Sequence, residues 1–280
     1  MTKARVTERR IRREGGFALL IVLWSLALLA LLGTQLMASA RTELQLASNI
    51  RSSAVLEAEA DGLVYATIFR LMSDAPEQRG VDGLDHATAA PGGRGIVRVT
   101  SLAGKVNPNT ASEALLSALL QRVGVGAKPA ASLAAAIVDW RTPGQLARPL
   151  GAKGPQYRAA NLPYSPPGTP FETVEELRQV LGMTPDLVAR LAPYMSVHYP
   201  GDPVRSAADP VVLGILRGTG AGEDGTPPEG VEDGGVYVQI DATVMRAGGQ
   251  AFTRRAAVWA GHGARRGRYL VLGWEVAALQ

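Results

Sequence analysis

A run of 24 residues without a charged side chain, residues 17–40, constrains this chain more than any other feature of its sequence. As an α-helix that rises about 1.5 Å per residue, the run would be about 36 Å long. The hydrocarbon core of a bilayer is about 30 Å thick, so such a helix is long enough to cross it. The run contains nine leucines, and no Lys, Arg, Asp or Glu opposes its insertion into lipid. We therefore expect residues 17–40 to be the transmembrane part of an N-terminal helix.

The charged residues are distributed unevenly on the two sides of this run. The 280 residues include 29 basic and 25 acidic side chains, which gives a formal net charge of +4. Residues 1–16 contain six basic and two acidic side chains, so the remaining 264 residues carry 23 of each sign. By the positive-inside rule, residues 1–16 stay in the cytoplasm and the bulk of the chain faces outward. The neutral total of that bulk provides no general signature of nucleic-acid binding.

Three processing fates are open for the N-terminus. The apolar helix could remain as an uncleaved anchor, or Ala38-Ser39-Ala40 could be the cleavage site of an ordinary secretory signal. In the third fate, cleavage precedes the apolar run, because a short basic leader ends in Gly16 and Phe17 follows directly. This third pattern resembles the class III signal of type IV pilins and type II secretion pseudopilins. The resemblance implies that prepilin peptidase cuts between Gly16 and Phe17, that Phe17 is then N-methylated, and that the helix stays with the mature protein.

The fifth position after this cleavage site is Ile21. Most members of the pilin family have glutamate there, which is thought to neutralise the N-terminal amine of a neighbouring subunit during assembly. Burying an unpaired amine is unfavourable, so a subunit with Ile21 suits the tip of a filament, where no earlier subunit's amine needs a partner. Within type II secretion, the lack of this glutamate is typical of the K-class minor pseudopilins.

The segments after the apolar run predict an α+β fold. Residues 41–73 contain no proline and have spaced apolar positions, so we expect the helix to continue there as an amphipathic helix. Residues 74–94 are rich in Gly, Pro and Asp and indicate a loop. Alternating patterns predict one strand at 95–102 and three more near the C-terminus, at 236–245, 251–260 and 267–276. The expected core is a pilin-like long N-terminal helix packed on a small antiparallel sheet.

The middle of the chain has a different pattern. Residues 107–200 show few strand signals and several helical ones. Helices expected at 111–123 and 129–140, joined by a glycine-rich turn, resemble a helix-hairpin-helix, and residues 177–194 resemble a weaker second copy. Residues 140–170 indicate a long ordered loop between the copies. A large inserted helical domain of helix-hairpin-helix-like character is therefore expected within the sheet domain.

The sequence predicts a division of the chain into six segments. They are a cytoplasmic leader peptide at 1–16, the transmembrane part of the helix at 17–40, the rest of the pilin helix with a loop and the first strand at 41–104, the inserted helical domain at 105–217, a flexible loop at 218–235, and the C-terminal antiparallel strands at 236–280.

Short motifs within the insertion resemble those of the K-class minor pseudopilins. They are Asn107-Pro-Asn-Thr-Ala111, Val138-Asp-Trp140, Gly151-Ala with Tyr157, Leu162-Pro-Tyr164, and Glu175-Glu-Leu177 followed by Gly182-Met-Thr. With the N-terminal pattern, the resemblance covers the chain from Gly15 to about Leu216. It implies a single-pass inner-membrane protein with its bulk in the periplasm, and no enzymatic activity. Such a subunit caps the tip of the periplasmic pseudopilus and helps initiate its assembly, for export of folded proteins across the outer membrane.

The same resemblance implies the partners of the chain. These are the other minor pseudopilins of the I and J classes, the major pseudopilin, the prepilin peptidase and the inner-membrane assembly platform, with no nucleic acid among them.

Calcium is the one cofactor to consider, because K-class pseudopilins bind it through acidic residues of the inserted domain. Calcium takes about six to eight oxygen ligands. After Asp139 the chain continues with Trp140-Arg-Thr-Pro-Gly-Gln and later has Lys153-Gly154, so most of the acidic residues expected there are absent. Asp139 is the one candidate ligand at this place, and a capping or ion-pairing role is its alternative. The chain has no cysteine and three histidines, which argues against thiolate and histidine-rich metal sites.

The main alternative function is that of a membrane-anchored helix-hairpin-helix nucleic-acid-binding protein. Such a hairpin presents backbone N–H groups to phosphate, with flanking basic residues adding affinity. Here only Arg122 and Lys128 are basic near the predicted turn. An outward-facing hydrolase is a third option, but the sequence contains no G-x-S-x-G, H-E-x-x-H or P-loop motif.

Overall fold

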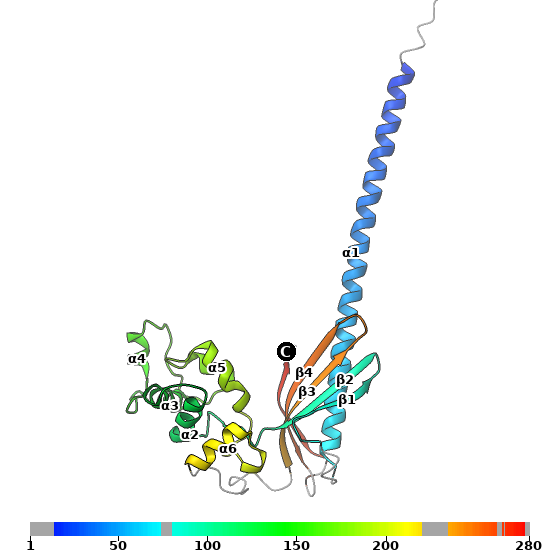
Figure 1. Cartoon of the computed structure of the whole chain (residues 1–280). Coiled ribbons are helices and arrows are strands. Elements are labelled where there is room, and N and C mark those ends of the chain that lie inside the picture. Colours follow the sequence, from blue (N-terminus) through cyan, green and yellow to red (C-terminus); the bar gives the residue numbers. More distant parts are fainter. Residues whose placement is uncertain (1–13, 74–79, 220–234, 262–264, 266, 278–280) are drawn as a thin grey trace, which may run out of the picture. The chain divides into compact units, whose positions relative to one another are not determined.

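The computed structural model describes residues 14–73, 80–219, 235–261, 265 and 267–277 (Figure 1). The chain divides into two compact units, Met1–Val55 and Leu56–Gln280. Most of the predicted leader peptide and nearly all of the predicted flexible loop at 218–235 lie outside the described residues. The proposed division into six segments stays a prediction.

Helix α1 (Glu14–Leu71) begins in the first unit and ends in the second. Its 58 residues include the 19-residue stretch Phe17–Gln35, which has a mean hydropathy of 2.5 and side chains that are all exposed. By length and composition this is the one stretch of the described chain that could cross a membrane. The predicted continuation of the helix beyond residue 40 is observed. The helix ends five residues before Pro76, which could not continue it.

The second unit contains one sheet of five strands, all paired antiparallel with their neighbours in chain order. The strands are β1 (Asp85–Ala90), β2 (Gly93–Ser101), β3 (Gly235–Met245), β4 (Ala251–Gly261) and β5 (Tyr269–Val276). The α+β fold class and the C-terminal meander are confirmed.

Strand β1 corrects the prediction of a loop over residues 74–94. Residues 85–90 form a hairpin with β2, in which Arg98 donates two hydrogen bonds of 2.9 Å to the carboxylate of Asp85. Apart from His86, the strand consists of small side chains, and most of them are exposed. It is an edge strand whose pairing with β2, and not its own residue pattern, defines it.

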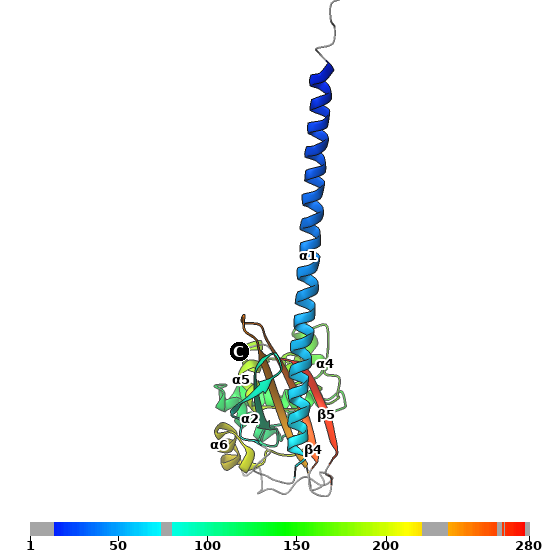
Figure 2. The ribbon, with the colours of Figure 1, turned by 90° about the vertical axis from the view of Figure 1, so that its right-hand side faces the viewer.

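One face of the sheet is buried against the last turns of α1 within the second unit (Figure 2). Val64, Ile68 and Leu71 of α1 are at most 1% exposed and pack against the apolar side chains of β2, β3 and β4. From Tyr237 to Met245, strand β3 alternates between half-buried and buried residues, as the two-residue period of a strand requires. The packing of the helix on the sheet is therefore specified by the spacing of apolar residues along α1 and by the two-residue period of the strands.

A helical region lies between β2 and β3 and has its own apolar core. Its α-helices are α2 (Glu113–Arg122), α3 (Ala127–Arg141), α4 (Gly154–Ala159), α5 (Pro185–Leu191) and α6 (Pro210–Thr219), and its 3-10 turns are η2 (Val174–Gln179), η3 (Ala192–Tyr194) and η4 (Arg205–Ala207).

Three local features of this region differ from the prediction. The predicted loop at 140–170 contains the short helix α4. The second hairpin copy begins with the 3-10 turn η2 and not with an α-helix. The chain changes direction soon after η2 at Gly182, which has a φ of +85°. Helix α6 was not predicted, although Asp209 marks its start by accepting a hydrogen bond of 2.8 Å from the Val211 N–H.

Candidate functional site

The residues predicted for processing and assembly lie in the first turns of α1. Phe17 and Ile21 are both exposed, at 70% and 51%. The hydroxyl of Ser25 donates to the carbonyl of Ile21 at 2.7 Å, and that of Thr34 donates to the carbonyl of Leu31 at 2.8 Å. The hydroxyls of Ser25 and Thr34 are thus satisfied within the helix, as a lipid environment demands. Cleavage between Gly16 and Phe17, methylation of Phe17 and the assembly role of Ile21 stay predictions.

The motif Asn107-Pro-Asn holds together segments that are far apart in the sequence. The amide of Asn107 donates to the carbonyls of Tyr199 at 2.6 Å and Val197 at 3.3 Å, and its oxygen accepts from the Asn109 N–H at 2.8 Å. Asn109 exchanges two hydrogen bonds with the backbone of Phe171, at 2.9 and 2.7 Å. The two asparagines therefore form hydrogen bonds with the backbone of distant loops, and not only at the start of α2.

Four of the motif and loop aromatics form one cluster beside these asparagines. Trp140 stacks on Phe171, with ring centroids 6.0 Å apart, and contacts Tyr157 and Tyr164. Tyr157 is fully buried, and its hydroxyl accepts a hydrogen bond of 2.9 Å from the Leu181 N–H. Burial raises the pKa of Tyr157 to about 12, so this hydroxyl stays neutral. The cluster packs the long loop against α3.

Asp139 lies near the end of α3 and is 1% exposed. Its carboxylate accepts a hydrogen bond of 3.1 Å from the Arg148 N–H and lies 3.7 Å from Nε of the same arginine. A Cβ added at Gly151 would lie 2.1 Å from Oδ2 of Asp139, so only glycine allows the loop to approach the carboxylate this closely. The ion-pairing role given as the alternative for Asp139 is the one that its contacts show.

Lys153 completes this site and was noted in the sequence only as a departure from acidic residues. It is 3% exposed, and its ammonium group donates to the backbone carbonyls of Asp139 and Thr142, both at 2.5 Å. The backbone N–H of Lys153 donates to the side-chain oxygen of Gln156 at 3.0 Å. In the part of the chain that is described, no three His, Cys, Asp or Glu side chains lie close enough together to hold a metal ion. The residues here do not fit a calcium site of the expected kind.

The turn between α2 and α3 is the predicted helix-hairpin-helix turn. Gly124 has a φ of +98°, which favours glycine, and the side chains of Arg122 and Lys128 beside it are exposed. Leu115, Leu119 and the apolar face of α3 lie in the core of the helical region. The hairpin is thus a packing element, and its exposed basic residues are few.

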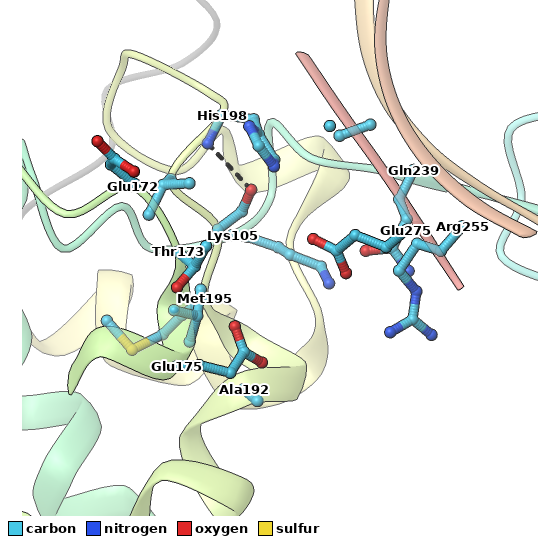
Figure 3. Close-up of a pocket in the computed structure, with 15 residues that line it drawn as sticks. Lys105, Glu172, Thr173, Glu175, Ala192, Met195, His198, Gln239, Arg255 and Glu275 are labelled. Atoms are coloured by element: carbon cyan, nitrogen blue, oxygen red, sulfur yellow. Dashed lines mark hydrogen bonds between the residues drawn. The ribbon is translucent and has the colours of Figure 1, made fainter. Parts of the chain in front are cut away.

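A polar cavity of about 120 Å³ lies within the second unit, where the segment around residue 197 faces the sheet (Figure 3). Burial lowers the pKa of Lys105, and nearby Arg255 lowers it further. Burial also lowers the pKa of His198, an effect that Glu275 opposes. The N–H of His198 donates to the Ser196 hydroxyl at 3.2 Å, the dashed bond in Figure 3. The lining comes from the inserted region and from strands β3, β4 and β5, which are far apart in the sequence.

The fold and these sites define a pilin-like protein whose sheet carries a large helical insertion. Residues 97–200 match the family model of the type II secretion system (T2SS), protein K. The resemblance to the K-class minor pseudopilins is confirmed over the region that this model matches.

A solved structure shows the same fold. A chain of the crystal structure of the GspK-GspI-GspJ complex from the type 2 secretion system of enterotoxigenic Escherichia coli superimposes with a TM-score of 0.60. The match has 17% sequence identity and covers 83% of this chain and 99% of that chain. No curated protein matches the sequence significantly.

Proposed function

We propose that this minor pseudopilin caps the tip of the periplasmic pseudopilus and helps to initiate its assembly, for export of folded proteins across the outer membrane. The observation that carries the proposal is the presence, in one chain, of a protein K region at 97–200 and a membrane-length apolar helix at Phe17–Gln35. The protein is then anchored once in the inner membrane, with its bulk in the periplasm, and serves as an assembly subunit without catalysis.

Ile21 supports the tip position. A subunit that joins beneath others would place its fifth mature residue near the free N-terminal amine of the subunit above, and Ile21 offers that amine no carboxylate. Leaving such an amine unpaired in an apolar environment is strongly unfavourable. The first subunit in the filament has no subunit above it, so it needs no carboxylate at this position. The helical insertion adds bulk to the head, which fits a cap better than a repeating subunit.

The partners follow from the same proposal. The matched solved structure is that of a GspK-GspI-GspJ complex, which supports the I-class and J-class minor pseudopilins as partners. The proposal adds the major pseudopilin, the prepilin peptidase and the inner-membrane assembly platform, and no nucleic acid.

The mature N-terminus tests the processing step on which this function depends. Mass spectrometry of the protein from the membrane fraction is expected to find N-methylated Phe17 as the first residue. A Gly16→Leu variant, in which the scissile backbone is less accessible, should keep its leader. A mature chain that starts at Arg41 would make the protein an ordinary secreted one. An intact Met1 in a strain with active peptidase would favour the anchored nucleic-acid-binding alternative.

The substitution Ile21→Glu tests the tip position, with Ile21→Leu as the matched control. The glutamate supplies the carboxylate that permits insertion beneath another subunit, so the order of subunits in cross-linked pseudopili should change and secretion should fall. Ile21→Leu should leave both unchanged. Normal secretion and an unchanged complex with the other minor pseudopilins in Ile21→Glu would count against the tip assignment.

A further inference from the structure

The loop that follows α3 is organised around a buried ammonium group. We propose that Lys153 is an internal cation that takes the place of a divalent metal ion in this loop, so that the fold of residues 139–157 is independent of calcium. The family resemblance implies calcium in the inserted domain, and the disagreement between that expectation and the residues present is the basis of the proposal.

The position of the ammonium group is set by the end of a helix. Helix α3 ends at Arg141 and Thr142 is its C-cap, and the last carbonyls of a helix have no partner within it. Lys153 Nζ donates to two oxygens at this end, the carbonyls of Asp139 and Thr142. A cation there also interacts favourably with the negative end of the helix dipole. The lysine therefore binds carbonyl oxygens in the way that a bound metal ion would.

The carboxylate of Asp139 is committed to other partners. It accepts the Arg148 N–H and pairs with the Arg148 guanidinium, and it lies against the backbone at Gly151. The backbone and side-chain oxygens of Asp139 thus both face cationic donors, one from Lys153 and one from Arg148. A calcium ion would need about six to eight oxygens at roughly 2.3–2.6 Å and would be repelled by both positive groups.

The burial of Lys153 makes its contribution measurable. A charge that is almost fully buried must be compensated, and removing one partner of such an arrangement leaves the other partners without compensation. In Lys153→Met, the two carbonyls at the end of α3 lose their donor while the apolar volume of the side chain is kept. In Lys153→Gln, an amide N–H replaces part of the hydrogen bonding without the charge.

The first test measures the response of the unaltered protein to calcium. The full chain is purified in detergent, and hydrogen exchange of residues 139–157 is followed by mass spectrometry with added calcium chloride and with EDTA. We expect the same exchange rates and the same unfolding midpoint under both conditions. A higher midpoint or slower exchange in calcium would overturn the proposal, whether or not the chain caps a pseudopilus.

The second test changes the cation itself. Lys153→Met should lower the unfolding midpoint by roughly 6 °C or more and speed the exchange of residues 139–157 by about tenfold or more. Lys128→Met, at an exposed lysine of α3, is the matched control and should change neither. Exchange in Lys153→Met that equals that of Lys128→Met would overturn the proposal.

A third variant keeps the proposal testable if Lys153→Met does not fold. Lys153→Glu reverses the charge and places a second carboxylate near Asp139, so calcium should slow exchange in Lys153→Glu more than in Lys153→Gln. Equal responses of the two variants to calcium would show that the position does not hold a cation and would overturn the proposal.

Discussion

In the sheet region, buried arginines pair with carboxylate side chains, whereas in the inserted helical region the buried polar side chains bind mainly the backbone. Arg254 of β4 is nearly buried and donates to the carboxylates of Glu57, at 2.5 Å, and Asp61, at 2.6 Å, on α1. Arg246 pairs with Glu59 at 2.9 Å. Each of these contacts joins the sheet to the helix that packs on it.

The inserted region uses its polar side chains differently. Asn107, Asn109 and Lys153 direct their donors at backbone carbonyls of distant residues. Arg141 does the same with the carbonyls of Pro108 and Ala111, and burial lowers its pKa. These side chains act as donors for a backbone that has few regular partners of its own.

The difference follows from where backbone hydrogen bonds are made. Strands and helices satisfy their own N–H and C=O groups, so a polar side chain beside them needs another side chain as partner. Between α3 and α5 the chain is mostly loops and short turns, and its buried carbonyls need donors from elsewhere. A few long polar side chains therefore specify the conformation of the insertion. The sheet is specified by the backbone hydrogen bonds between its strands and by the period of its apolar residues.

Asn107→Leu should produce the largest effect and confine it to the insertion. The change removes three hydrogen bonds and leaves two carbonyls and one N–H without a partner, at a cost of about 3 kcal/mol in the free energy of unfolding. Hydrogen exchange should accelerate over residues 105–125 and 195–200. Gln121→Leu, at an exposed position of α2, is the control. An equal acceleration over 236–260 would show that the two regions are not stabilised separately.

Arg254→Met is the corresponding change in the sheet region. It should cost about 2 kcal/mol, less than a fully buried pair, because Glu57 and Asp61 are partly exposed and recover water. The faster exchange should appear over 56–71 and 251–260. Arg255→Met is the matched control, since Arg255 is more exposed and pairs with Asp241 within the sheet. A larger loss in Arg255→Met would contradict this account.

The same contrast explains how much of the molecule could be predicted from the sequence. The long apolar helix, strands β3 to β5 and the α2–α3 hairpin follow from local periodicity. Strand β1 was missed because its small residues become a strand only by pairing with β2. The weaker hairpin copy predicted at 177–194 begins within the 3-10 turn η2, and the turn at Gly182 follows directly.

The candidate sites divide in the same way. The N-terminal pattern and the motif residues could be named from the sequence, because they form short contiguous strings. The contacts of Lys153 could not, since its acceptors are backbone carbonyls of residues 11 and 14 positions away. The cavity near His198 could not either, because its lining comes from the insertion and from three strands.

Tyr157→Phe tests, at a single hydrogen bond, how much a side chain that binds the backbone stabilises the inserted region. The hydroxyl serves the Leu181 N–H in the insertion, so its removal leaves a backbone donor without this partner and should cost about 1 kcal/mol. Chemical denaturation of the full chain in detergent measures the loss. Tyr164→Phe keeps the ring contacts with Trp140 and is the control. Equal losses in the two variants would mean that the rings, and not the bond to the backbone, provide the stability.

His198→Gln should have the smallest effect and appear only as a change in pH dependence. His198 is half-buried where the insertion faces β5, and burial lowers its pKa in the folded chain below the 6.5 of the unfolded chain. The unfolded chain therefore binds the proton more readily, so stability is fully present above pH 6.5 and falls as the pH drops through the folded pKa. The protection of residues 195–200 against hydrogen exchange, relative to the intrinsic exchange rate at each pH, should fall from above to below pH 6.5 in the unaltered protein and change less in His198→Gln. His86→Gln is the control, because His86 is exposed and pairs with Asp82. An unchanged pH dependence in His198→Gln would show that the loss of stability at low pH arises elsewhere.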